Sequence, residues 1–219
     1  MIRQLRWFRT RSRRMRATYS SRLKALSIRM ILRVGRCQMI EGTRLFVLFG
    51  TEEERTIAAT KLRYALQLLA RFDPERHVRV LRDLTAVIVL RDTVAAASID
   101  ESTRVCLLSG AQIRLDKNGL ATAILLVHEA THGMLLRRGF CIEACGRGRV
   151  ERCCTRAQAS FVRHLPEFAG KQEILKSLSV SEEETLAADY SPAARRRRLA
   201  DKLREIGWPN WLVRFVART

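Results

Sequence analysis

The sequence predicts an α+β domain that is mainly helical, with a small β-sheet ahead of its central helix. Two observations indicate this: apolar residues recur at helical spacing in several segments, and short β-rich runs lie between them in the first half of the chain. At 219 residues the chain is long enough for one domain with a substantial core. We assign residues 1–40 to a basic N-terminal arm and residues 41–219 to the domain.

The arm holds much of the positive charge. It has 12 Lys and Arg residues and no acidic residue, within a chain whose net charge is +19. Residues 24–36 fit a basic amphipathic helix, with Ala25, Ile28, Ile31 and Leu32 on one side. Three roles stay open: contact with an anionic membrane surface, nonspecific contact with nucleic acid, and packing of a solvated arm on the domain. An organellar transit peptide has a similar composition.

The domain begins with a strand and a long helix. Residues 45–49 are apolar and predict a short strand. Thr51 and Glu54 have the spacing of a capping box, in which each side chain bonds the backbone N–H of the other residue. A helix is therefore predicted to begin after Thr51 and to continue to about Phe72, since apolar residues recur along it at helical spacing.

More short elements follow before the central helix. Asp73 and Pro74 start a second helix, predicted to end near Leu81. Residues 85–90 are β-rich, and a loop over residues 91–102 leads to a second strand at residues 104–108 and a candidate third strand at residues 111–115. Two or three strands are therefore predicted ahead of the central helix, and an edge strand of such a sheet offers free backbone groups to an extended peptide.

The central helix is predicted over residues 121–139 and carries the pattern H-E-x-x-H at His128, Glu129 and His132. Positions four apart lie on one helix face, so both imidazoles can point at one metal ion. Glu129 is rotated by about 100°, and its carboxylate can reach a metal-bound water without being a ligand. The alternative is an amphipathic helix with two histidines in a polar pocket. The apolar run before His128 disfavours it, because burying these groups is costly without a metal or firm partners.

A catalytic zinc ion needs a third protein ligand and an open position. Arg138 stands where one class of H-E-x-x-H enzymes has a third histidine, which excludes that class. Glu151 lies 19 positions after His132, on a helix predicted over residues 149–165. Its alternative is a surface carboxylate paired with a nearby arginine. The downstream candidates for the third ligand are Glu143, Glu151, His164 and Glu167.

The motif and the position of Glu151 resemble the gluzincin metallopeptidases, the group with thermolysin-like and aminopeptidase-like enzymes. The strings VHEATHG, RVERCC and FVRHLP also resemble small bacterial proteins with a HEATH signature. This resemblance implies a zincin-like fold and a zinc ion held by His128, His132 and Glu151. The chain lacks the Gly-rich motif of the aminopeptidases and the asparagine-bearing context of the thermolysin-like enzymes, so the resemblance does not fix the substrate class.

The predicted function is that of a zinc-dependent hydrolase, and the expected class is a peptidase that acts on a peptide or protein substrate. Zinc lowers the pKa of its water, and Glu129 acts as general base as this water attacks a carbonyl. Tyr190 and His164 are the candidates for a second electrophile, each with an ordinary structural role as its alternative. The alternative function is a catalytically inactive, zinc-stabilised module that contacts anionic membrane or nucleic acid through the arm.

The remaining predictions concern the cysteines, the location and the C-terminal region. The six cysteines fit free thiols in a reducing compartment better than a second zinc site, because their spacing gives only a weak metal signal. We expect a cytoplasmic location, with peripheral contact to a membrane left open. Helices are predicted over residues 192–206 and 210–217.

Overall fold

The computed structural model describes residues 25–48, 50–91, 96–140, 146–187, 201 and 204. Tyr190, Glu143 and the predicted helix at residues 210–217 lie outside these ranges. The predicted helix at residues 192–206 lies mostly outside them too, and only positions 201 and 204 are described, both as helical.

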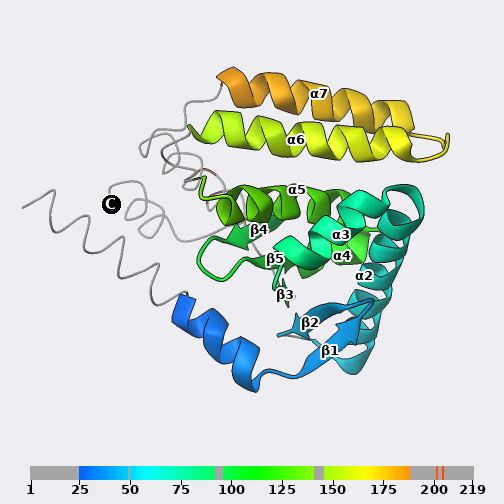
Figure 1. Cartoon of the computed structure of the whole chain (residues 1–219). Helices are drawn as coiled ribbons and strands as arrows, with labels where there is room; N and C mark the ends of the chain where they lie inside the picture. The colour runs from blue at the N-terminus through cyan, green and yellow to red at the C-terminus, as the bar shows by residue number, and fades with distance from the viewer. Residues whose placement is uncertain are drawn as a thin grey trace, which may run out of the picture.

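A five-stranded mixed sheet forms the centre of the fold (Figure 1). Its two inner pairings, β2 with β3 and β3 with β5, are parallel, and each edge strand is antiparallel to its neighbour. All five strands precede the motif helix, as predicted, and the mainly helical α+β class is confirmed. In spatial order the strands are β1 (Cys37–Ile40), β2 (Thr43–Val47), β3 (Ala86–Leu90), β5 (Val105–Ser109) and β4 (Ala97–Asp100).

Strand β1 extends the sheet into the segment assigned to the arm. It pairs with β2 through a two-residue turn in which both Glu41 (φ 47°) and Gly42 (φ 81°) have positive φ. Such turns match the twist of a hairpin, and Gly42 adopts this conformation without strain. A helix over residues 25–34 precedes β1 and packs on the sheet. Residues 25–40 are therefore part of the folded domain.

The other helices lie mainly on the opposite face of the sheet. Helices α2, α3 and α5 contact one another, α6 packs on α5, and α7 packs on α6 (Figure 1). The capping box predicted at Thr51 and Glu54 is confirmed, and the side chain of Asp73 caps α3. The helices are α2 (Glu52–Phe72), α3 (Pro74–Asp83), α4 (Gly110–Leu115), α5 (Leu120–Arg137), α6 (Arg147–His164) and α7 (Lys171–Ala187).

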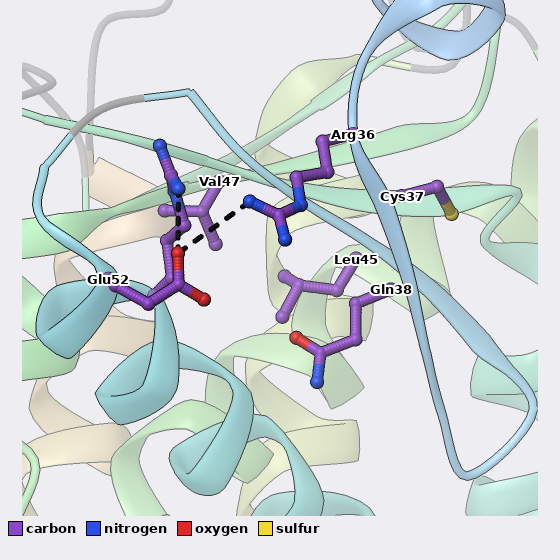
Figure 2. Close-up of a pocket in the computed structure, with 7 residues that line it drawn as sticks. Arg36, Cys37, Gln38, Leu45, Val47 and Glu52 are labelled. Carbon is purple, nitrogen blue, oxygen red and sulfur yellow. Dashed lines mark hydrogen bonds and ion pairs between the residues drawn. The ribbon is translucent and has the colours of Figure 1, made fainter.

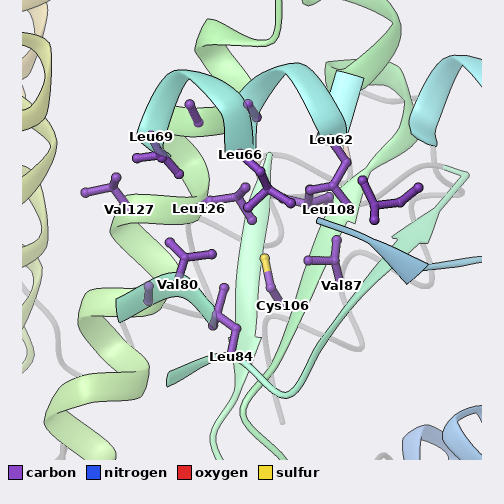
Figure 3. Close-up of a cluster of buried hydrophobic side chains, with 14 of the residues drawn as sticks. Leu62, Leu66, Leu69, Val80, Leu84, Val87, Cys106, Leu108, Leu126 and Val127 are labelled. Carbon is purple, nitrogen blue, oxygen red and sulfur yellow. The ribbon is translucent and has the colours of Figure 1, made fainter. Parts of the chain in front are cut away.

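Both faces of the sheet are covered by apolar side chains. Val87 and Cys106 point towards α2 and α5, where they meet Leu66 and Leu126 in the main core (Figure 3). Their strand neighbours point the other way, because successive side chains alternate between faces, and there Ile88 and the other residues of a second cluster pack under the helix at residues 25–34. Central parallel strands that are buried on both faces have continuous apolar runs of this kind.

Some predicted elements are wrong, and some elements of the structure were not predicted. Residues 111–115 belong to helix α4 and do not form a third strand. Ile113 is buried but Leu115 is 75% exposed, so these alternate apolar residues do not share one buried face, as they would in a strand of the sheet. The loop predicted at residues 91–102 contains strand β4. Strand β1 and helix α7 were not predicted. In the described ranges, no helix has the length and apolar character needed to cross a membrane.

Candidate metal centre

Helix α5, which carries the H-E-x-x-H pattern, is anchored at its start by a buried carboxylate. One oxygen of Asp116 accepts from the backbone N–H of Gly119 at 3.0 Å, and the other accepts from the backbone N–H of Thr122 at 2.8 Å. Helix α5 thus begins at Leu120, one residue before its predicted start, and the capping side chain is Asp116. A negative charge at a helix N-terminus also interacts favourably with the helix dipole.

The far end of α5 is held against α3. A Cβ atom at Gly133 would lie 2.5 Å from the carbonyl oxygen of Asp83, so only glycine permits this approach of the two helices. The carboxylate of Asp83 is fully buried and accepts from Nε of Arg137 at 2.7 Å and from Arg82. These contacts fix the helix segment that follows His132.

The two motif histidines and Glu151 converge, although Glu151 comes from α6. The Nε2 atoms of His128 and His132 are 3.2 Å apart, and Oε2 of Glu151 lies 3.2 Å from the first and 3.4 Å from the second. In a tetrahedral zinc site with bonds of about 2.0–2.2 Å, neighbouring ligand atoms lie about 3.3–3.5 Å apart. The triangle of ligand atoms therefore has the size that a zinc ion requires.

Gln158, on α6, orients the first histidine. Its Nε2 donates to the backbone carbonyl of Ile124 at 3.2 Å, and its Oε1 lies 3.2 Å from Nδ1 of His128. Because a carbonyl only accepts, the amide orientation is fixed, and Oε1 must accept the N–H at Nδ1. That tautomer leaves the Nε2 lone pair of His128 directed at the centre of the triangle. The Nδ1 atom of His132, by contrast, is buried and has no hydrogen-bond partner in the described structure.

Glu151 is shared between the histidines and an arginine. Its second oxygen, Oε1, lies 3.3 Å from Nε of Arg147, one helical turn earlier. Burial alone would raise the pKa of Glu151, but hydrogen bonds and charge from His128 and His132 hold it well below its ordinary value. The carboxylate is therefore ionised, as a metal ligand must be. The expected pairing with an arginine occurs together with the approach to the imidazoles and does not replace it.

Glu129 lies next to this triangle with a free carboxylate. The residue is 4% exposed, and its side chain makes no hydrogen bond or ion pair in the described part of the chain. Burial raises the pKa of Glu129, with His128 and His132 opposing the shift. Burial, and then the charge of Glu129, raise the pKa of Cys106 on strand β5. A buried carboxylate without partners is costly, and such groups occur mainly at functional sites.

Cys154 is a further candidate ligand that the sequence analysis missed. Its sulfur and one nitrogen of each of His128 and His132 lie within 4.8 Å of one another. Burial, and then the charges of Glu151 and Glu129, raise the pKa of this thiol. Since a cysteine binds metal as the thiolate, binding through Cys154 would have to displace its proton, whereas Glu151 is already ionised. Cys154 and Gln158 lie three and seven positions after Glu151, on the same face of α6, and this helical spacing was the signal that could have identified them.

The other candidates do not join the site. His164 lies 13 residues after Glu151 on α6, about 20 Å along the helix axis, and its Nδ1 is 2.8 Å from Asp73. Glu167 forms an ion pair with Lys171. The described cysteines, Cys37, Cys106, Cys153 and Cys154, are free thiols.

An apolar hollow of about 400 Å³ lies beside α5 on the N-terminal side of the triangle. It is lined by Leu120, Ile124 and Leu125 of α5, by Ala96 just before β4, and by Ile174 of α7. Ile124 is one helical turn before His128 and therefore lies on the same side of the helix. The hollow thus continues the surface that carries the histidines.

Comparison of the chain with models of protein families, with curated proteins and with solved structures found no match. Functional inference for this chain therefore depends on the geometry of the site.

Proposed function

We propose that the protein is a zinc-dependent hydrolase that cleaves peptide or protein substrates. The observation that carries the proposal is the triangle of His128 Nε2, His132 Nε2 and Glu151 Oε2, with sides of 3.2–3.4 Å, next to the unpartnered carboxylate of Glu129. When bound there, zinc would supply Lewis acidity and lower the pKa of water towards neutrality. The donor set of two imidazoles and one carboxylate is typical of catalytic zinc sites, which keep one position open.

Glu129 is suited to the role of general base. Its raised pKa brings its proton affinity closer to neutral pH, which is where proton transfer by a carboxylate is most effective. Because no described side chain occupies its oxygens, they are free to accept a proton from the attacking water and to pass it to the leaving amine. Arg147 and Gln158 act behind the ligands: Arg147 holds the second oxygen of Glu151, and Gln158 holds His128 in one tautomer.

The free edge of the sheet near the motif helix supports the proposal that the substrate is a peptide. Strand β4 contacts α5, and in the described chain no strand pairs with its outer edge. The N–H of Ser109 bonds to the carbonyl of Ala96, so by the alternation of an antiparallel pair the backbone groups of Ala97 and Ile99 face outward. An extended peptide can add to such an edge by β-augmentation, and the apolar hollow next to it offers space for a large apolar side chain.

Metal analysis and peptide hydrolysis test the proposal. The full chain, purified with zinc, should hold one zinc per molecule and should cleave members of a peptide library. His128→Ala and Glu151→Gln should lose zinc and hydrolysis together, whereas Glu167→Gln, which removes an exposed carboxylate in the connection between α6 and α7, should keep both. Full zinc occupancy in His128→Ala would show that the metal lies elsewhere.

Cys154 supports a second candidate function. If its sulfur joins the two histidines and Glu151, the zinc has four protein ligands and no open position, which is the composition of a structural site. The protein would then be a zinc-stabilised binding module. Cys154→Ser separates the two functions: a catalytic site should retain zinc and hydrolysis, and a structural site should lose zinc affinity in a protein that never hydrolyses peptides.

A further inference from the structure

The helix over residues 25–34 has apolar side chains on two opposite faces. On the inner face Ile28 is buried, and Ile31 and Leu32 are partly buried against the sheet. On the outer face Leu26, Met30 and Val34 follow one another at intervals of four residues and are 54%, 57% and 77% exposed. At about 100° per residue these three side chains form a stripe roughly opposite to Ile28. The inner face suffices to hold the helix on the domain, so packing within the described domain does not explain the outer stripe.

Unpaired positive charge borders this stripe. Arg29 and Arg33 are exposed, lie one turn apart beside Met30, and contact no acidic side chain in the described chain. Arg36 differs, because it shares the carboxylate of Glu52 with Arg55 at the edge of a hollow of about 320 Å³ between β1, β2 and α2 (Figure 2). The sequence adds to this charge, since residues 1–24 contain 9 Lys and Arg residues and no acidic residue.

We infer that this face docks peripherally on an anionic phospholipid surface. Interfacial helices of this kind insert large apolar side chains at the level of the headgroups, while flanking basic side chains contact anionic lipids. A nucleic acid would use the arginines but would leave Leu26, Met30 and Val34 without an apolar environment. A second copy of the chain would cover the apolar stripe but would bring Arg29 and Arg33 near the same charges of its partner. The lipid surface satisfies both the apolar and the charged groups.

Vesicle co-sedimentation with the full chain tests this inference. The wild-type protein should bind vesicles that contain phosphatidylserine and should bind pure phosphatidylcholine vesicles at least about tenfold more weakly. L26S/M30S/V34S should weaken binding to the anionic vesicles by about tenfold or more. R29S/R33S should reduce the preference for anionic lipid. A matched control, V78S/F140S/V180S, removes three exposed apolar side chains of other helices and loops and should bind like the wild type.

Several results would overturn the inference. Equal binding by L26S/M30S/V34S and wild type would show that this face does not contact lipid, even if the basic segment before it does. Salt-sensitive binding to duplex DNA without binding to vesicles would assign the charge to nucleic acid. A wild-type dimer that becomes a monomer in L26S/M30S/V34S would assign the stripe to self-association. Thermal unfolding of each variant separates loss of the surface from loss of the fold, and none of these readouts depends on the metal centre.

Discussion

In most proteins ionisable side chains are exposed and large apolar side chains are buried, and the two faces of this sheet depart from that rule in opposite ways. On the α5 side, polar and ionisable groups are buried: Glu129 is 4% and His132 is 5% exposed. On the other side, the helix at residues 25–34 exposes large apolar groups, and Val34 is 77% exposed. Each arrangement costs free energy in an isolated protein in water. The difference is one of chemistry: ionisable groups are buried on the first face and large apolar groups are exposed on the second, and this is why we propose a cation for the first and an anionic lipid surface for the second.

Glu129→Gln, on the α5 side of the sheet, should have the largest of the expected effects. The amide keeps the shape of the side chain but cannot accept a proton, so peptide hydrolysis should fall by about 10²–10⁴-fold. Zinc content should stay at the wild-type level, because Glu129 is not among the proposed ligands. Steady-state kinetics with a fluorogenic peptide, together with metal analysis, measure both quantities. Unchanged hydrolysis in this variant would remove Glu129 from the mechanism.

Ile28→Ala and Met30→Ala should separate the two faces of the helix at residues 25–34. Ile28 is 4% exposed, so its truncation leaves a cavity and should lower the free energy of unfolding by about 2–4 kcal/mol. Met30 is 57% exposed, and the same substitution there should change it by no more than about 0.5 kcal/mol. Urea unfolding followed by circular dichroism provides the measurement. Similar losses at both positions would mean that the outer face is also packed in the folded protein.

Gln158→Ala should weaken metal binding without removing a ligand. The N–H at Nδ1 of His128 loses its acceptor, and such orienting partners typically contribute about 10–100-fold to metal affinity. Competition with a chromophoric chelator gives the zinc dissociation constant. Gln158→Glu restores an acceptor for Nδ1 but removes the N–H that is donated to the carbonyl of Ile124, so it should recover only part of the affinity. Gln158→Met fills a similar space without a strong acceptor and is the packing control: wild-type affinity in this variant would attribute the loss in Gln158→Ala to packing and not to the hydrogen bond.

The pH dependence of the metal-free protein should show the smallest of these effects. Burial lowers the pKa of His128, but Glu151 and Glu129 reverse this and raise it above its ordinary value of 6.5, so its contribution to stability is full below that value and is lost as pH rises. The pKa of Glu151 is depressed, so its contribution is full above the ordinary 4.5 and is lost in acid. Metal-free stability from this pair should peak between the two values. Thermal melts in a chelator, with Glu151→Gln as control, test this; the variant should show a flatter profile.

Local signals predicted most of the elements. The capping box at Thr51 and Glu54 and the Asp73-Pro74 start each concern neighbouring residues, so both were visible in the sequence and both are confirmed. The edge strands were not visible. Strand β1 has three exposed residues and one buried residue, and β4 is a four-residue polar segment, so neither shows clear alternation of apolar side chains. Their pairing with longer strands stabilises them, and this depends on tertiary structure.

The candidate site was partly predictable. Two ring nitrogens four residues apart are brought together by helix geometry alone, and the approach of Glu151 is as its spacing predicted. Gln158 and Cys154 lie near the histidines because α6 packs on α5, and a sequence pattern does not reveal which helices pack together. The sequence also did not show which face of the helix at residues 25–34 is exposed. Ile28, Ile31 and Leu32 were correctly placed on one side, but that side packs on the sheet, and a different set of apolar residues is exposed.

The sheet also fixes an orientation. The helix at residues 25–34 packs on one face of β2 and β3, while the histidine pair belongs to the helical layer on the other. A protein resting on lipid through Leu26, Met30 and Val34 would hold its histidine pair on the side of the sheet that faces away from the bilayer. The thickness of the domain would then set the distance between the proposed site and the bilayer. The site could act on polypeptides that extend that far above the bilayer, and not on segments embedded within it.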